Sequence, residues 1–293
     1  MKTCYYEIGG HSLAVCFVNE ENSDDLIPSF APFRLQEEPA ELLFTMLVDD
    51  NLDWPEQNDE IGQFDCGGCN HGVYRRDDGG YLYSIHDIHD VLCSRMQSNA
   101  DFSECCVSLY GKTWVQRNYG LNNALMMAYA FASACSATML MHASVIRQGG
   151  KGYLMTAPSG TGKSTHSRLW LNHIPDTELL NDDNPVIRVF DSKALVYGTP
   201  WSGKTPCYKN MQVPLKAVVR LSQAPYNKIA RLAPLQAFAS LMPACSCKRW
   251  DNEAMSLLHK SVEKTITMVP CYHLECLPDE AAAMVCYNAV LAE

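Results

Sequence analysis

The chain has no basic segment followed by an apolar one at its start, and it contains no internal repeat and no low-complexity tract. Charged residues are also scarce, at 19%, whereas 47% of the residues are hydrophobic. These features argue against secretion, collagen-like repetition and intrinsic disorder. We expect a soluble protein of the cytoplasm.

The 14 cysteines lack the spacing of a small disulfide scaffold, so we expect most of them to be reduced and buried as small hydrophobic residues. One pair, Cys66 and Cys69, forms a C-x-x-C motif with His71 nearby. This motif suits half of a zinc site or a redox pair, but a second pair at zinc spacing is missing. The sequence therefore leaves open whether Cys66 and Cys69 bind a metal.

No charged residue lies between Arg117 and Arg147, and the stretch from Leu121 to Met141 is long enough to span a bilayer. Asparagine, serine and threonine side chains within the stretch argue against a membrane segment. We predict instead a helix at about 120–140 that is buried inside the protein.

Charge is distributed unevenly along the chain. Residues 1–120 carry 21 acidic and 7 basic side chains, a net charge of −14, and residues 121–293 carry 12 acidic and 16 basic side chains, a net charge of +4. The acidic part disfavours binding to nucleic acids and anionic membranes, whereas the mildly basic part suits a phosphate-bearing ligand. The acidic surface would either attract a basic partner or only keep the protein soluble.

Length and pattern both favour two domains. A chain of 293 residues is longer than one hydrophobic core usually serves. Residues 1–118 contain short β-rich runs separated by turns, which predicts a mainly antiparallel β domain that we expect to recognise the substrate. Residues 119–293 continue, after the predicted helix, with strand, glycine-rich turn, helix and strand, which is typical of an α/β domain. The fold class is therefore α+β overall, with an α/β catalytic domain.

The stretch 157–165 has the context of a phosphate-binding loop, because it follows a short apolar strand and precedes a helical segment. Its glycines would let backbone N–H groups turn inward around phosphate oxygens. Lys163 would reach the β- and γ-phosphates, and Ser164 would offer its hydroxyl to Mg²⁺. Ala157 replaces the usual first glycine and is acceptable if its φ is negative. The predicted nucleotide-binding residues are Ser159, Gly160, Thr161, Gly162, Lys163, Ser164 and Thr165.

A second stretch, residues 198–205, reads G-T-P-W-S-G-K-T and matches the same consensus more literally. However, Pro206 follows immediately, and residues 207–211 show no amphipathic helix whose N-terminus could face a phosphate. We predict that this stretch is a flexible element near the site. Lys204 is a candidate second contact to phosphate or substrate, and a solvent-exposed lysine is the alternative.

Asp182 and Asp183 end a short apolar strand and follow Lys163 by 19 residues. Two carboxylates at such a strand end can divide the work, one holding Mg²⁺ and the other accepting a proton from an attacking hydroxyl. The alternative is a turn-capping role before Asn184 and Pro185. His142 precedes the strand of the first loop, where a histidine by itself is more often a core residue than a ligand.

Together, Met141–Ser144, Ala157–Thr165 and Asn181–Asp183 resemble, in order and spacing, the C-terminal catalytic domain of HPr kinase/phosphorylase. They resemble the ATP-dependent phosphoenolpyruvate carboxykinases more distantly. The resemblance covers residues of about 140–290 and is strongest to HPr-kinase-like proteins that carry the G-T-P-W-S-G-K-T segment.

The resemblance implies a P-loop kinase domain in which Asp182 is the base for a serine hydroxyl and His142 lies beside the reacting groups. In the carboxykinases, the residues that match His142 and Asp183 bind a transition metal. The arginine-bearing signature of HPr kinases has no counterpart here, and residues 1–115 do not resemble their N-terminal domain. These departures argue against HPr itself as the substrate. A full carboxykinase metal set and an oxaloacetate-binding arginine are also missing, which argues against decarboxylation.

The sequence thus predicts an ATP- and Mg²⁺-dependent phosphotransferase whose acceptor is a hydroxyl, with serine of a peptide or protein as the first expectation. If the acidic surface is a docking face, that acceptor should be basic. The predicted catalytic residues are Asp182, His142, Lys163 and Lys204, and the predicted metal ligands are Ser164 and Asp183. The alternatives are a kinase for a small metabolite, an ATP-binding regulator without turnover and, more distantly, a phosphoenolpyruvate carboxykinase-like enzyme. We expect neither nucleic acid nor membrane as a partner, and the sequence allows a homo-oligomer.

Overall fold

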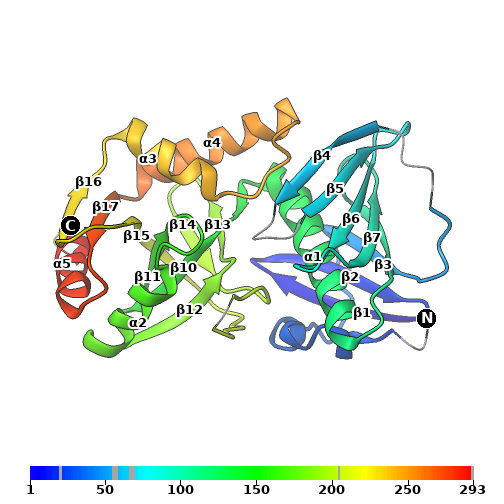
Figure 1. The fold of residues 1–293 in the computed structure, drawn as a ribbon, viewed down its shortest axis with the longest axis horizontal. Coiled ribbons are helices and arrows are strands. Elements are labelled where there is room, and N and C mark those ends of the chain that lie inside the picture. The colour runs from blue at the N-terminus through cyan, green and yellow to red at the C-terminus, as the bar shows by residue number, and fades with distance from the viewer. Residues whose placement is uncertain (20–21, 55–58, 66–69, 204, 292–293) are drawn as a thin grey trace. The chain divides into compact units, whose positions relative to one another are not determined.

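The computed structural model describes residues 1–19, 22–54, 59–65, 70–203 and 205–291 (Figure 1). The chain forms two compact units, Met1–Ser133 and Ala134–Glu293. Each unit has its own β-sheet and at least one α-helix, so the fold is of the mixed α/β type with two sheets. Cys66, Cys69 and Lys204 lie outside the described residues, and the predictions made for them stay predictions.

The first unit is built on an eight-stranded sheet in the order β1-β2-β3-β8-β7-β6-β5-β4. Strand β3 pairs in parallel with both β2 and β8, and the other pairings are antiparallel. Two 3-10 helices, η1 (Asp24–Leu26) and η2 (Pro28–Phe33), lie between β2 and β3. The strands are β1 (Lys2–Ile8), β2 (His11–Phe17), β3 (Phe44–Val48), β4 (Asp59–Asp65), β5 (Asn70–Arg75), β6 (Tyr81–His86), β7 (Leu92–Ser98) and β8 (Glu104–Leu109).

Helix α1 (Trp114–Ala132) begins before Arg117 and ends earlier than the predicted helix at about 120–140, and it packs against β7 and β8 of the first sheet. Ser94 on β7 donates a hydrogen bond to the Gly120 carbonyl, and the Tyr129 hydroxyl donates one to the Ile8 carbonyl. The helix therefore belongs to the first unit, and the chain divides after Ser133 rather than near residue 118. Within the described chain, no helix combines the length and the apolar character needed to cross a membrane.

The second unit holds a nine-stranded sheet in the order β12-β10-β11-β15-β14-β13-β9, with β17 also paired to β15 and β16 paired to β17. Its helices are α2 (Lys163–His173), α3 (Pro234–Leu241), α4 (Asn252–Met268) and α5 (Glu280–Leu291), with 3-10 turns η3 (Ser133–Ser136) and η4 (Met242–Ala244). Its strands are β9 (Thr138–Leu140), β10 (Ala143–Gln148), β11 (Lys151–Thr156), β12 (Thr177–Asp183), β13 (Val186–Val189), β14 (Ala194–Tyr197), β15 (Gln212–Gln223), β16 (Lys228–Arg231) and β17 (Cys271–Cys276).

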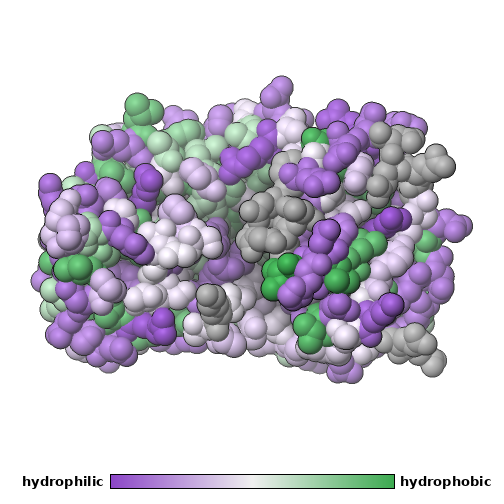
Figure 2. Space-filling model, viewed as in Figure 1, coloured by the Kyte–Doolittle hydropathy of each residue, from purple (hydrophilic) through white to green (hydrophobic). Residues whose placement is uncertain are grey.

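Helices cover both faces of this second sheet. Successive side chains of a strand point to opposite faces, so Tyr153 and Met155 of β11 pack with residues of α2 and α5, while Leu154 packs with residues of α3 and α4. Because β11 is buried on both faces, it reads in the sequence as a continuous apolar run. On the face of the molecule seen in Figure 2, hydrophobic residues form only small groups among hydrophilic ones.

Several strands of the second sheet end at the same edge. Strands β11, β15 and β17 are mutually parallel, and β12 runs the same way because β10 is antiparallel to both β11 and β12. The ends of β11, β12, β15 and β17 and the start of β10 therefore share one edge. The carboxyl edge of parallel strands is where ligands bind in open α/β sheets. The antiparallel strand β10 lies between β11 and β12, so one strand separates the loop after β11 from the end of β12.

Candidate functional site

The loop after β11 has the backbone of an anion-binding turn. Gly160 and Gly162 have φ values of +78° and +120°, which L-residues rarely adopt, whereas Ala157 has a negative φ. A Cβ at Gly160 would meet no heavy atom within 4 Å, so glycine is needed there for the backbone conformation rather than for space. Helix α2 begins at Lys163 without a side-chain cap, which leaves its N-terminus open to an anion.

Lys163 lies almost entirely buried at the start of α2, with 8% of its surface exposed. Its Nζ is 2.7 Å from Nε2 of His142 and donates to the Ala157 carbonyl at 3.3 Å. Burial lowers the pKa of Lys163, and the nearby carboxylates of Asp183 and Asp182 oppose that shift. A buried ammonium held by one histidine and one carbonyl is suited to exchange these partners for phosphate oxygens.

Ser164, the second residue of α2, donates a hydrogen bond from its hydroxyl to Oδ1 of Asp182 at 3.0 Å. Asp182 is 2% exposed, and its other oxygen, Oδ2, has no hydrogen-bond partner in the described part of the chain. A buried carboxylate oxygen without a partner costs free energy. Its position beside Ser164 makes it a ready ligand for a cation.

Asp183 faces a different partner. Its Oδ1 is 3.0 Å from Nδ1 of His142, and Oδ2 accepts from the side-chain amide of Asn184 at 3.0 Å. The Asp183 backbone has a φ of +119°, an unfavourable conformation for a residue with a Cβ. Strain of this kind persists only where the surroundings hold the residue in place.

The two acids therefore belong to two different contacts, Ser164 with Asp182 and His142 with Asp183. Adjacent residues of a strand point to opposite sides, which explains why Asp182 and Asp183 do not share partners. The sequence-based assignment had grouped Ser164 with Asp183 around the metal, and the structure places Ser164 against Asp182.

The described part of the G-T-P-W-S-G-K-T segment lies directly on the acid pair. Asn181, which is fully buried, donates from its side-chain amide to the Thr199 hydroxyl at 3.0 Å and to the Trp201 carbonyl at 3.1 Å. The Asp182 carbonyl accepts from the Ser202 hydroxyl at 3.0 Å and from the Gly203 N–H at 2.5 Å. Residues 198–203 are thus anchored to β12 and are not the flexible element that the sequence suggested.

These contacts also argue against a phosphate-binding role for the described part of this segment. The N–H groups of Gly198, Trp201 and Gly203 already donate to acceptors within the protein. No helix follows the segment over residues 205–211. A Cβ at Gly203 would lie 3.0 Å from the Asp183 Cβ, so the consensus glycine here permits close packing against the acid.

Asn181 and Thr199 were missed as site residues by sequence reasoning. Asn181 belongs to the segment 181–183 and Thr199 to the segment 198–205, but the sequence alone assigned a role to neither residue. The signal available for Asn181 is an amide side chain in the middle of a buried apolar strand, which requires a hydrogen-bond partner.

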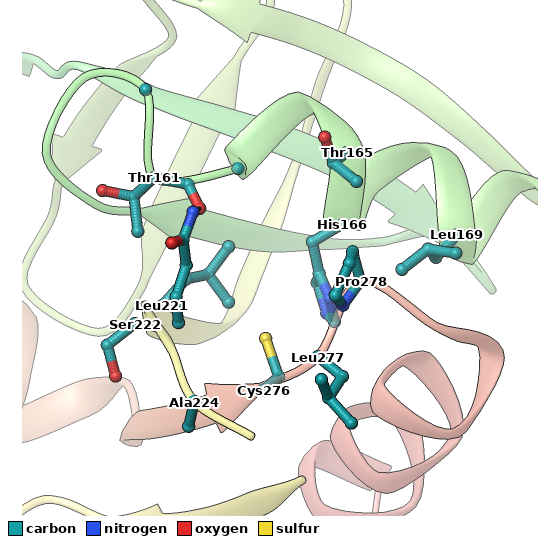
Figure 3. Close-up of a pocket in the computed structure, with 13 residues that line it drawn as sticks. Thr161, Thr165, His166, Leu169, Leu221, Ser222, Ala224, Cys276, Leu277 and Pro278 are labelled. Atoms are coloured by element: carbon teal, nitrogen blue, oxygen red, sulfur yellow. Dashed lines mark hydrogen bonds between the residues drawn. The ribbon is translucent and has the colours of Figure 1, made fainter. Parts of the chain in front are cut away.

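A cavity of about 540 Å³ adjoins the loop after β11, on the side of β15 and β17 (Figure 3). The loop and α2 form one wall of the cavity, and the ends of β15 and β17 form the other. Gln223, the last residue of β15, donates from its side-chain amide to the Thr161 carbonyl at 3.2 Å and so ties the strand end to the loop. The residues lining the cavity are Gly160, Thr161, Gly162, Thr165, His166, Leu169, Leu221, Ser222, Gln223, Ala224, Cys276, Leu277 and Pro278.

Comparisons with known proteins do not assign the chain to a family. No protein-family model and no curated protein sequence matches the chain. Among solved structures, the chain is similar to the HPr(Ser) kinase/phosphatase from Coxiella burnetii, with a TM-score of 0.31 and 11% sequence identity, over 52% of this chain and 91% of that chain. A likeness at this level assigns neither an activity nor a residue, so the function has to be argued from the site.

Proposed function

We propose that the unit Ala134–Glu293 is an ATP- and Mg²⁺-dependent kinase domain that transfers the γ-phosphate to a hydroxyl, with serine of a peptide or protein as the favoured acceptor. The observation that carries the proposal is the convergence of Lys163, Ser164, Asp182 and the His142–Asp183 pair at the open N-terminus of α2. Phosphoryl transfer needs a phosphate cradle, a metal and a proton acceptor in one place, and this edge offers candidates for each.

Ser164 and Asp182 fit a magnesium ion. Carboxylate and hydroxyl oxygens are ligands that Mg²⁺ accepts, and Oδ2 of Asp182 is a buried oxygen without a partner among the described residues. These two residues would hold the ion. An ion held there would supply positive charge to offset the negative charge of the phosphates.

Lys163 would bind the β- and γ-phosphates through charge-assisted hydrogen bonds. To do so, its Nζ leaves Nε2 of His142, from which it is now 2.7 Å away. Nucleotide binding would therefore release the histidine at the same step that positions the phosphates.

His142 is then suited to take the acceptor proton. Its Nδ1 lies against the Asp183 carboxylate, which fixes the proton on Nδ1 and leaves Nε2 as an acceptor. The acceptor oxygen would form a bond to the γ-phosphorus, the bond between that phosphorus and the β,γ-bridging oxygen would break to leave ADP, and the hydroxyl proton would pass to Nε2 of His142. This proposal moves the base from Asp182 to the His142–Asp183 pair.

The acceptor class is tested with labelled ATP. Full-length protein, Mg²⁺ and γ-labelled ATP are incubated with matched basic and acidic serine peptides and, separately, with a metabolite pool. We expect label on the basic peptides, because residues 1–120 carry a net charge of −14, and a rate that falls as salt shortens the Debye length from about 10 Å at 0.1 M to about 3 Å at 1 M.

Two other outcomes would count against this proposal. Label confined to a neutral metabolite, with no dependence on salt, would identify a small-molecule kinase. Tight ATP binding with no transfer to any acceptor would identify a nucleotide-binding regulator instead.

A further inference from the structure

The cavity beside the phosphate loop has a lining without charge. Among its described lining residues there is no aspartate, glutamate, lysine or arginine. Its one imidazole ring, that of His166, is buried, with 3% of the residue's surface exposed. Its Nε2 accepts a hydrogen bond from the Trp170 indole at 3.1 Å, which is consistent with the neutral form. A cavity of this kind favours a neutral, partly apolar group over a second phosphate or an acidic peptide.

The position of the cavity relates it to the phosphate loop. Residues 160–162 belong both to the loop and to the cavity wall, so a ligand held by the loop extends directly into the cavity. The sheet order places β10 and β12 on one side of β11, and β15 and β17 on the other. The acids and His142 therefore lie on one side of the loop and the uncharged cavity on the other.

We propose that this cavity binds the nucleoside part, base and ribose, of a nucleoside triphosphate whose phosphates lie on the loop; the proposal rests on the proposed function. Aliphatic side chains of Leu169, Leu221 and Leu277 supply contact area for a base, as Figure 3 shows for the two cavity walls. The phosphate chain then runs across the N-terminus of α2 and ends with its γ-phosphate beside His142. The acceptor has to approach from the side of β10 and β12, because the nucleoside fills the opposite side.

A tryptophan substitution in the cavity tests this assignment by binding alone. Ala224→Trp would fill the cavity wall at the end of β15, and Ala230→Trp, on the exposed face of β16, is the matched control. The probes are ATP and inorganic tripolyphosphate, both with Mg²⁺, measured by titration calorimetry on the full chain. We expect Ala224→Trp to weaken ATP binding at least tenfold and tripolyphosphate binding less than twofold, with neither changed in Ala230→Trp.

The outcomes separate this proposal from the proposed function. Wild-type protein that binds neither probe would overturn the phosphate loop itself. Binding of both probes, with ATP affinity unchanged in Ala224→Trp, would leave the loop in place and overturn the nucleoside cavity.

A second measurement needs no substitution. Cys276 lines the cavity, whereas Cys135 is exposed and does not line it. Burial, with Asp279 nearby, raises the pKa of Cys276, so alkylation by N-ethylmaleimide is followed at about pH 8.5 with mass spectrometry of each site. ATP should slow alkylation of Cys276 at least fivefold and leave Cys135 unchanged, while tripolyphosphate should protect neither. Equal protection of Cys276 by both probes would overturn the assignment.

Discussion

The side-chain amide of Asn181 donates a hydrogen bond to the hydroxyl of Thr199 at 3.0 Å, and both residues are fully buried. The same Thr199 hydroxyl donates to the Asn184 carbonyl at 2.7 Å. These bonds involve the residues directly before and after Asp182 and Asp183, and Asp183 itself has a φ of +119°. A segment that resembles a phosphate loop thus serves to position the acid pair.

Thr199→Val tests this positioning role. The substitution keeps the shape of the side chain but removes the hydroxyl. The Asn181 amide, the Asn184 carbonyl and the Trp201 N–H would each lose a hydrogen bond. We expect a loss of about 1–3 kcal/mol of unfolding free energy, measured by urea denaturation, and a lower kcat with nearly unchanged ATP affinity. The control is Thr267→Val on the exposed side of α4, whose hydroxyl donates to the Lys264 carbonyl of the same helix. Unaltered stability and kcat would show that the acids hold their positions without Thr199.

Lys163→Met tests the choice of phosphate loop. The variant removes the ammonium while keeping most of the buried alkyl chain. We expect ATP affinity to fall by about 1.5–3 kcal/mol, or roughly 10- to 150-fold, because hydrogen bonds to charged groups are lost. Arg168→Met, on the exposed face of the same helix, is the control and should bind ATP like the wild type. An ATP affinity that survives in Lys163→Met and is lost in Lys204→Met would assign the nucleotide to the second segment.

The strand, glycine-rich turn and helix around residues 157–165 could be predicted from the sequence because their determinants are local. Gly160 and Gly162 specify the positive φ values, and the preceding apolar strand and following helix are readable from short patterns. The second segment matches the same consensus, but the sequence predicts no helix after it. The structure confirms this, because no helix lies between β14 and β15 in the described residues.

The partners of the two acids could not be predicted in the same way. They depend on the register between β10 and β12, which shifts between Val145 and Ile146, and no local pattern reports such an irregularity. The position of α1 depends likewise on long-range contacts, such as that between Tyr129 and Ile8. After Arg117, the uncharged remainder of this helix carries no pattern that says which sheet it covers.

His166 gives a prediction for stability at acidic pH. Its pKa is about 4 in the folded chain, against 6.5 when unfolded, because burial disfavours the charged ring. Between these values the unfolded chain binds more protons, so stability is full above pH 6.5 and falls as the pH drops towards 4. The shift corresponds to about 3 kcal/mol. His166→Gln should flatten this part of the pH dependence in urea titrations.

His89→Gln, in an exposed turn of the first unit, is the control for that series and should leave the slope unchanged. The wild-type transition can be followed through Trp170, whose indole bonds to His166. Equal slopes for wild type and His166→Gln would mean that the ring is not kept neutral by burial.

Removing the charge of Asp182 and removing that of Asp183 should impair different steps of the reaction, because Asp182 contacts Ser164 and Asp183 contacts His142. Asp182→Asn would remove the charge next to the open oxygen of the proposed metal site. We expect the Mg²⁺ concentration required for half-maximal activity to rise at least tenfold, with tripolyphosphate binding in the absence of Mg²⁺ little changed.

Asp183→Asn would instead remove the carboxylate that orients His142, since an amide can present its NH₂ group to Nδ1 and favour the wrong tautomer. We expect kcat to fall by about 10²–10⁴, the range for loss of general-base catalysis, while ATP affinity and the Mg²⁺ requirement stay near wild type. The two variants are compared in one assay with Mg²⁺ and acceptor varied independently. If Asp183→Asn raised the Mg²⁺ requirement and Asp182→Asn slowed transfer at saturating Mg²⁺, the roles would be reversed, as the sequence alone had suggested. Full activity in both variants would reduce the acids to caps of the turn before Pro185.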